Sequence, residues 1–325
     1  MIEARSLFRH ELAAVLIIKD EAVYIKEWID YHLLVGIDHF YVYNNDSSDN
    51  LTEILKPYVA DGLVTYHSIA GRCAQCAAYN DALGRYRFDC RYMICFDVDE
   101  FIYPKNDRRL IEFVDEIFDS DENIGEIVIH WQVFGSNNLD EAKLEQGVLD
   151  RFTRRAAENN PWNRFFKAIV NPRRVKFYPD PHYAICFGQK KIVDARCDEV
   201  RMSMRENTLK IITNANTNTT ELIALNHYVV KSREEYERKI ARGDAFYASN
   251  PRNEENFRKF DLNDVFDDGI IKYRDELMSS ERYTGGELRI EKFPRGYSTP
   301  YSKFYRPNSK TTHRKNFIAG KCTSS

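Results

Sequence analysis

The alternation of apolar, strand-like runs with helical patterns is the feature of this sequence that most restricts its fold. Between these runs, apolar residues recur at the spacing of an amphipathic helix, as they do from Glu21 to the stop signal Gly36. Repeated strand–helix units are typical of a parallel sheet covered by helices. The runs predicted to be strands are 13–18, 39–43, 63–69 and 92–96. The first part of the chain is therefore predicted to be an α/β domain with a mostly parallel central sheet.

The second half of the chain has a less regular pattern. Ser232 followed by Glu235 matches a capping box, which predicts a helix running to about residue 241. A further helical segment is predicted over 264–278. The strands predicted in this half are 124–131, 165–170 and 175–178, with irregular connections between them.

Composition shifts along the chain predict three parts. The α/β domain is expected over residues 1–250, a helical extension over 251–286, and a basic, loosely structured tail over 287–325. In the tail, Lys and Arg are interleaved with Phe, Tyr, Pro and Ser. Such a tail has the charge to contact an anionic membrane surface.

An acidic triplet follows the fourth predicted strand directly. Asp97 and Asp99, with Glu100 beside them, end the apolar run at 92–96. Ligands of open α/β sheets lie outside the carboxyl ends of the strands, so these carboxylates are expected at a ligand site. Oxygen donors at this spacing suit Mn²⁺ or Mg²⁺ with positions left open for phosphate oxygens. The alternative is a strand end with solvated acids or turn caps.

Polar residues also follow the other three predicted strands, so all four clusters are expected to converge on one crevice. A nucleotide-sugar fits such a crevice, with its base and ribose near the early loops and its diphosphate near Asp97. The alternatives are capping and turn roles for the early residues and a solvated helix start for the later ones. The residues predicted to bind the nucleotide-sugar are Lys19, Asp20, Glu21, Asn45, Asp46, Arg72, Gln75 and Asp97.

Net charge, hydropathy and cysteine content restrict the binding partners and the cellular location of such a protein. The formal net charge is −3, which argues against general nucleic-acid binding. No apolar run approaches the roughly 20 residues of a membrane helix, and no signal peptide is visible. The cysteines include a lone Cys73–Cys76 pair without a second pair at zinc-site spacing. These features predict a cytoplasmic protein whose basic tail associates with the membrane.

Several stretches in order along the chain resemble known sugar-transferring enzymes. The polar loop after the second strand resembles that of the family 2 GT-A glycosyltransferases. More specifically, the chain is similar to glycosyltransferase family 92 and its bacterial relatives over residues 12 to 245. The matching stretches are 18–21, 27–32, 97–102, 131–136 and 226–232. The resemblance implies a GT-A fold, which is Rossmann-like and binds nucleotide-sugars.

The resemblance also implies an activity. It implies metal-dependent, inverting transfer from a UDP-sugar to a glycan or glycolipid acceptor, with galactose the sugar best associated with the family. Together with the absence of an anchor, it favours a bacterial enzyme of surface-polysaccharide synthesis. A late histidine, His227, is expected to join Asp97 and Asp99 as a metal ligand, with His182 as the alternative. A nitrogen ligand would favour Mn²⁺ over Mg²⁺.

An inverting transferase needs a general base for the acceptor hydroxyl. The spacing of the carboxylates after Asp99 does not single out one of them as this base. Trp131 and Phe134 are candidate sugar-facing aromatics, with core packing as the alternative. Two other functions remain open from the sequence: a metal-dependent phosphohydrolase, and a non-catalytic carbohydrate-binding protein on a transferase fold. The carboxylates considered as the base are Asp140, Glu141, Glu158, Asp180 and Asp194.

Overall fold

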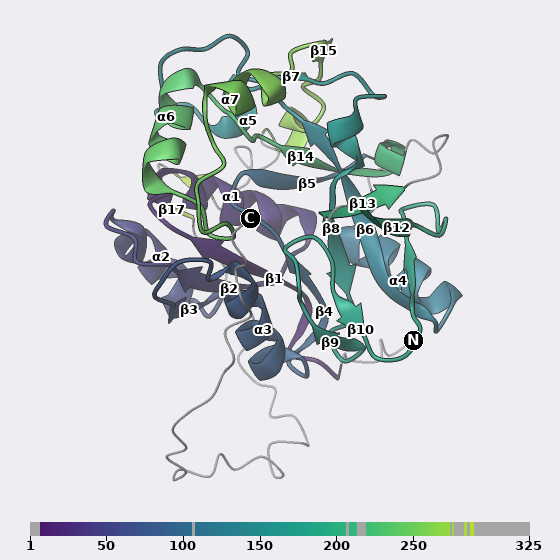
Figure 1. Cartoon of the computed structure of the whole chain (residues 1–325). Helices are drawn as coiled ribbons and strands as arrows, with labels where there is room; N and C mark the ends of the chain where they lie inside the picture. The colour runs from purple at the N-terminus through teal and green to yellow at the C-terminus, as the bar shows by residue number, and fades with distance from the viewer. Residues whose placement is uncertain are drawn as a thin grey trace.

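A nine-stranded sheet forms the centre of the molecule, with strand order β3-β2-β1-β4-β8-β6-β14-β5 and β11 beside β6 (Figure 1). This computed structural model describes residues 7–105, 108–205, 208–212, 219–273, 275, 283–284 and 287–288. Both parallel and antiparallel neighbours occur in the sheet. The predicted α/β class with a mostly parallel sheet is confirmed.

The first four strands run parallel and alternate with three helices, as predicted. Gly36 ends the first helix in a left-handed conformation, with φ of 109°, which glycine adopts without steric cost. The strands are β1 (His10–Ile18), β2 (His39–Asn44), β3 (Val64–Ser68) and β4 (Cys90–Cys95). The helices are α1 (Ala22–Val35), α2 (Leu51–Ala60) and α3 (Gln75–Tyr86).

The second half of the sheet is mixed. Strand β8 pairs antiparallel with both β4 and β6, so β6 runs in the same direction as β4. Strand β14 is parallel to β6, and β5 is antiparallel to β14. The strands of this half are β5 (Glu100–Pro104), β6 (Ile124–Val133), β8 (Phe166–Val170), β11 (Lys191–Val193) and β14 (Ile223–His227).

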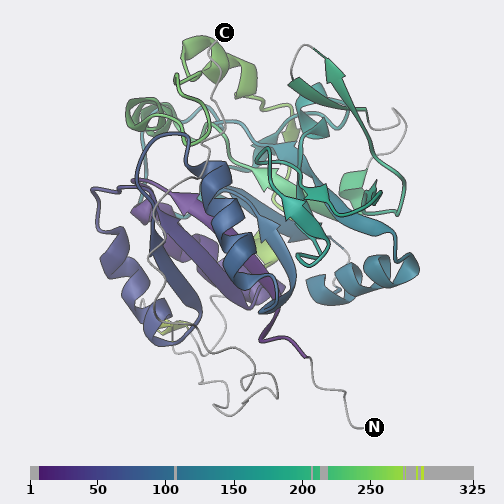
Figure 2. The same ribbon diagram turned by 60° about the horizontal axis from the view of Figure 1, so that its bottom comes forward.

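Helices cover both faces of the sheet. The larger apolar cluster joins one face to α1, α2 and α4 (Leu110–Ser120), and it includes the fully buried Trp28 and Phe101. The smaller cluster joins the other face to α3 through Ala78 and Leu83. In Figure 2 the dark blue helix α3 lies in front of the strands. The domain is therefore a three-layer α/β/α arrangement.

Short elements complete the described chain. The helices are α5 (Val148–Arg151), α6 (Arg233–Arg242) and α7 (Glu254–Phe260), with 3-10 turns η1 (Pro161–Arg164) and η2 (Thr219–Glu221). The short strands are β7 (Arg154–Arg155), β9 (Val175–Phe177), β10 (Ile185–Cys186), β12 (Arg201–Arg205), β13 (Thr208–Ile212), β15 (Val265–Phe266), β16 (Tyr283–Thr284) and β17 (Glu287–Leu288).

The helix predicted over 264–278 is wrong at its start. Residues 265–266 form β15, which pairs antiparallel with β7, and helical structure is described at 271–273. Strand pairing overrides the local helical pattern here because it satisfies backbone groups that a lone helix end leaves exposed. Residues 276–278 lie outside the described residues, as does the predicted basic tail beyond 288.

No helix of the described chain is long and apolar enough to cross a membrane.

Helix α6 is fixed to the domain by a buried ion pair. The predicted capping box is present, since the Ser232 hydroxyl accepts the Glu235 N–H and the Glu235 carboxylate accepts the Ser232 N–H. The same carboxylate binds both guanidinium nitrogens of Arg151 at 2.7 and 2.9 Å and accepts the Tyr24 hydroxyl. Burial raises the pKa of Glu235, but Arg151 and Ser232 outweigh it and hold the pKa at about 2. Helix α6 therefore has a defined position relative to α1.

We predict that Arg151→Met lowers the free energy of unfolding by about 3–5 kcal/mol, because it leaves the Glu235 charge buried and unpaired. Urea denaturation measures this loss. Arg85→Met, at an exposed pair with Asp81, is the control and should cost less than about 1 kcal/mol.

The Arg151–Glu235 pair also makes the stability of the fold depend on pH. Because the folded pKa of Glu235 is depressed, its stabilisation is complete above pH 4.5 and is lost as pH falls toward 2. The Arg151→Met/Glu235→Gln double variant should lose less stability over that window than the wild type. Equal losses in both proteins would contradict the assignment.

Candidate functional site

The carboxyl ends of six strands lie at one edge of the sheet. Strands β1, β2, β3, β4, β6 and β14 all run in the same direction, and the antiparallel β5 and β8 begin where these strands end. The chain leaves β1 toward β2 and β3, and β4 lies on the other side of β1. The point between β1 and β4 is therefore the topological switch point, where open α/β sheets bind ligands.

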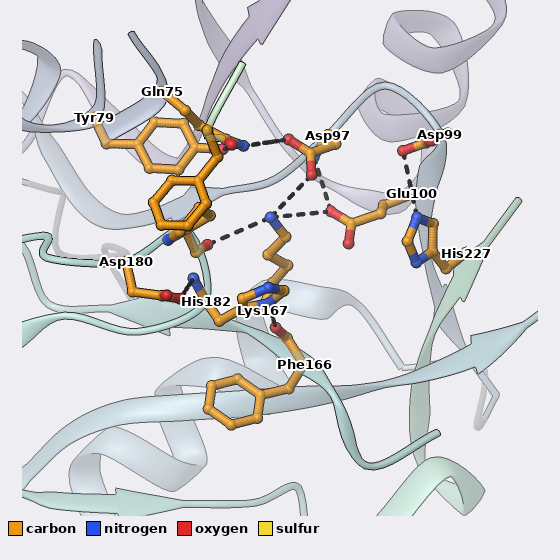
Figure 3. Close-up of polar contacts among 12 residues, drawn as sticks. Gln75, Tyr79, Asp97, Asp99, Glu100, Phe166, Lys167, Asp180, His182 and His227 are labelled. Atoms are coloured by element: carbon orange, nitrogen blue, oxygen red, sulfur yellow. Dashed lines mark hydrogen bonds and ion pairs between the residues drawn. The ribbon is translucent and has the colours of Figure 1, made fainter. Parts of the chain in front are cut away.

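Asp97 lies at this edge in a network of polar contacts (Figure 3). Its Oδ1 accepts from the Gln75 amide at 2.8 Å, and its Oδ2 lies 3.0 Å from the Lys167 ammonium. Lys167 is buried and also lies 3.7 Å from Glu100. Although burial lowers the pKa of Lys167, Asp97 and Glu100 raise it above its usual value. The Asp97 carboxylate thus has a fixed cationic partner.

Glu100 is fully buried beneath this pair. Its two oxygens accept from the Trp131 indole N–H and from the Asp97 backbone N–H, both at 2.8 Å. Burial raises the pKa of Glu100 to about 8, although Lys167 opposes the shift. Glu100 therefore orients Asp97 and Trp131 rather than facing solvent.

Asp99 is held by a different lysine. Its Oδ2 lies 2.5 Å from the Lys239 ammonium on α6, and its Oδ1 lies 3.6 Å from His227 Nε2. Burial raises the pKa of Asp99, but Lys239 and His227 outweigh burial and keep the pKa well below its usual value. Burial lowers the pKa of Lys239 to about 8, and Asp99 partly opposes this. Both groups are therefore charged at neutral pH.

Two side chains of this cluster fit a divalent cation. Asp99 Oδ1 faces His227 Nε2, while the buried His227 Nδ1 has no hydrogen-bond partner. Asp97, by contrast, is directed to Lys167 and Gln75. Within the described ranges, no group of three His, Cys, Asp or Glu is arranged to hold a metal. A bound ion would therefore take part of its coordination from a ligand such as a diphosphate.

The loops after β1 and β2 are tied to each other. Asp20, with φ of 49°, accepts the Ser48 N–H at 2.6 Å. The Asn45 amide donates to the carbonyls of Ile69 and Gly71, so its hydrogens are used within the protein. Asp46, also at positive φ, accepts the Gly71 N–H. These predicted nucleotide contacts lie at the sheet edge, where their hydrogen bonds shape the loops.

The remaining predicted donor contacts face the segment that follows α6. Glu21 pairs with Arg242 at 2.6 Å, and Arg242 also donates to the Lys19 carbonyl. The Arg72 guanidinium donates to the Ala248 carbonyl. Gln75, already bonded to Asp97, donates its backbone N–H to Ala245. Helix α6 and residues 243–248 thus cover the region that these residues line.

The five candidate bases fall in different places. Asp180 lies beside Lys167 and His182 in the cluster, and its Oδ1 accepts the His182 N–H (Figure 3). Glu158 pairs with Arg155. Asp194 accepts two backbone N–H groups of its own turn, and Asp140 and Glu141 are exposed near the start of α6.

The predicted aromatic and histidine residues differ in whether they lie at the site. Trp131 contacts both His227 and His182, with ring centroids 4.2 and 5.4 Å apart. His182 is hydrogen-bonded through Nδ1 to the Phe166 carbonyl. Phe134 is fully buried against Tyr228, so the expectation that it faces a sugar is wrong. Phe134 lies just after β6 and joins the same apolar cluster as Val133 and Tyr228, so core packing determines its surroundings.

Three cations at the site were missed by sequence reasoning: Lys167, Lys239 and Arg242. Lys167 is the second residue of β8, and it reaches the edge because β8 runs antiparallel to β4. Lys239 and Arg242 are one turn apart on α6. A signal existed for the latter two, since a predicted helix that follows His227 closely must lie near the same edge.

A sheet with an acidic cluster at its switch point is the arrangement that the resemblance to GT-A glycosyltransferases implied. The particular family follows from comparison with known sequences: the model of glycosyltransferase family 92 matches residues 14–268. The chain therefore belongs to glycosyltransferase family 92, as its resemblance indicated.

Matches to individual relatives cover less of this chain than the family model does. A family 92 protein of Arabidopsis thaliana is 27% identical over 178 residues, which are 52% of this chain and 30% of that protein. Galactan beta-1,4-galactosyltransferase GALS2 of the same species is 38% identical over 89 residues, 24% of this chain and 17% of that protein. Matches to curated relatives span 17 to 30% of their length. The solved S. aureus TarS 1-349 with UDP aligns at a TM-score of 0.36 and 12% identity, over 52% of this chain and 50% of the TarS 1-349 chain.

We predict that Asp99→Asn destabilises the fold by about 3–5 kcal/mol, because it leaves the buried Lys239 ammonium unpaired. Asp97→Asn should cost less, since its side chain is 35% exposed and Lys167 keeps Glu100 as a partner. Denaturant unfolding measures both. The Asp99→Asn/Lys239→Met double variant should regain much of the loss, and equal stability of both single variants would contradict the different roles assigned to the two carboxylates.

Proposed function

We propose that this protein is a metal-dependent, inverting glycosyltransferase that transfers a sugar, with galactose favoured, from a UDP-sugar to a glycan or glycolipid acceptor. The observation that carries the proposal is that Asp99 faces His227 at the switch point of a family 92 chain, where Asp97 is held by Lys167. Glycosyl transfer requires a charged leaving group to be stabilised in a site that excludes water. The buried ionic network around Asp99 is suited to that task.

The proposed metal ligands are Asp99 and His227, with Asp97 nearby. A carboxylate and an imidazole together suit Mn²⁺ better than a purely oxygen site does. A bound Mn²⁺ or Mg²⁺ would supply positive charge to the diphosphate leaving group. The proposal takes His227 rather than His182 as the nitrogen ligand, because His227 Nε2 lies 3.6 Å from Asp99 Oδ1.

The donor loops are proposed to act through shape as well as direct contact. Asn45 and Asp46 fix the loop after β2 by hydrogen bonds to Ile69 and Gly71, and uracil and ribose are proposed to lie against that loop. Lys19, Asp20, Arg72 and Gln75 complete the proposed donor region. Solved TarS and glucosyl-3-phosphoglycerate synthase are described in complexes with UDP, and we extend that nucleotide to this chain as part of the proposal.

Asp180 is the proposed general base. It is the candidate carboxylate that lies beside Lys167 and His182, on the other side of Lys167 from Asp97 (Figure 3). A base has to accept the proton of the acceptor hydroxyl during in-line attack, so it must lie across the reacting sugar from the leaving group. Asp180 is half-buried, which leaves its carboxylate open to an acceptor.

The proposal extends to the setting of the reaction. A cytoplasmic enzyme of surface-polysaccharide synthesis, attached to anionic lipid by the basic residues beyond 288, accounts for the composition of the chain. The division into a domain over 1–250, an extension over 251–286 and a tail over 287–325 is proposed on the same basis.

The activity is tested by incubating the protein with UDP-sugars and Mn²⁺ and measuring UDP release. We expect slow release that an acceptor accelerates, with UDP-galactose the best of the donors. Asp97→Asn should reduce this release by at least about 100-fold, the scale seen when an electrostatic contact to the transition state is removed. Release of inorganic phosphate instead would identify a phosphohydrolase, and no turnover with any UDP-sugar would contradict the proposal.

For the base, we predict that Asp180→Asn lowers kcat by about 10²–10⁴-fold, the usual contribution of general-base catalysis. The affinity for UDP should change little, because Asp180 lies away from Asp99. Asp194→Asn serves as the matched control, since that carboxylate is used within its own turn. An equal loss of UDP affinity in Asp180→Asn would assign Asp180 to the donor site instead.

A further inference from the structure

A group of buried or largely buried cations comes from α6 and from the segment that joins it to β14. Lys239 and Arg242 lie on one face of α6, with side chains 9% and 17% exposed. Lys231, just before the helix, is also buried. Two cations from this short stretch of chain are thereby removed from water at the sheet edge, and a third is largely removed. Buried charges are costly unless partners compensate them, so their partners are informative.

Only part of this charge is balanced within the described chain. Lys239 pairs with Asp99 at 2.5 Å, and Arg242 pairs with Glu21 at 2.6 Å. The Lys231 ammonium lies over the Tyr24 ring at 4.5 Å, and among the described residues it forms no ion pair. The segment therefore carries an excess of positive charge against the two carboxylates that face it.

The position of these cations indicates what anion they receive. Glu21 follows β1 and Asp99 follows β4, so the two ion pairs flank the switch point between these neighbouring strands. Lysine and arginine are the usual side-chain ligands of phosphate oxygens, and arginine can contact two oxygens at once. A diphosphate at the switch point would meet both cations from the same helix face.

We propose that Lys239 and Arg242 bind the donor diphosphate directly, exchanging the oxygens of Asp99 and Glu21 for phosphate oxygens. Lys231 adds the charge that the two carboxylates leave unbalanced. In the absence of donor, the carboxylates keep the cations compensated. When the donor binds, the exchange releases Asp99 Oδ2 from Lys239. This inference rests on the proposed UDP-sugar donor.

The exchange predicts that Asp99 competes with the diphosphate for Lys239. We therefore measure binding of UDP and of inorganic pyrophosphate by calorimetry in EDTA, where a metal role of Asp99 makes no contribution. Lys239→Met should weaken both ligands by about tenfold or more, as expected for the loss of one charge-assisted contact. Lys239→Arg should retain most of the affinity. Asp99→Asn should bind both ligands more tightly than the wild type.

Two comparisons separate direct binding from support of the fold. The Asp99→Asn/Lys239→Met double variant lacks both partners, and it should bind as weakly as Lys239→Met. Recovery of affinity in the double variant would overturn the inference, because Lys239 would then only neutralise Asp99. Arg238→Met, an exposed cation of the same helix paired with Glu234, is the matched control and should bind normally.

The other possible results of this binding assay also bear on the inference. If Lys239→Met folds and its affinity for UDP and pyrophosphate is unchanged, the inference is overturned. If Lys239→Met does not fold, Arg242→Met is measured in its place in the same assay. Wild-type protein that binds pyrophosphate in EDTA but binds no UDP even with Mn²⁺ would refute the proposed donor and leave the cation site standing. Wild-type protein that binds neither ligand in EDTA would overturn the inference, whether or not UDP binds once Mn²⁺ is added.

Discussion

The structure of the site depends on the compensation of buried carboxylates at one edge of the sheet. Asp99 and Glu100 are almost completely buried where β4 gives way to β5, and Asp97 stands beside them. Isolated charges in such a setting are unfavourable by several kcal/mol each, so lysines must reach them. Lys167 comes from β8 and Lys239 from α6. The positions of these two elements are thus coupled to the acidic triplet.

This coupling explains why α6 is anchored so firmly. The capping box at Ser232 and the buried pair of Arg151 with Glu235 hold the start of the helix, and its last turns then deliver Lys239 and Arg242 to the sheet edge. Figure 1 shows α6 beside α7 at one end of the molecule, and Tyr236 packs against Phe257 between them. The same helix that compensates the carboxylates is therefore the one that covers the proposed donor region.

Sequence patterns predicted the parallel half of the sheet well, because its strands and helices have strong local periodicity and clear stops such as Gly36. The acidic triplet was placed at the sheet edge because it follows a predicted strand, whereas His227, the last residue of β14, was named through the family resemblance and not through a predicted strand. Lys167 could not be found in this way. Its location depends on β8 running antiparallel between β4 and β6, a long-range pairing that leaves no local signal. Phe134 and the start of the 264–278 segment failed for the same reason, because tertiary packing decided their surroundings.

The central claim is that a nucleotide diphosphate binds between the ends of β1 and β4, against Asp99 and α6. A crystal structure of the protein soaked with UDP and Mn²⁺ tests this claim most directly. We expect the diphosphate within hydrogen-bonding distance of Lys239, with the metal bound to Asp99 and His227. A diphosphate located away from the β1–β4 switch point, or a metal held by other residues, would contradict the account.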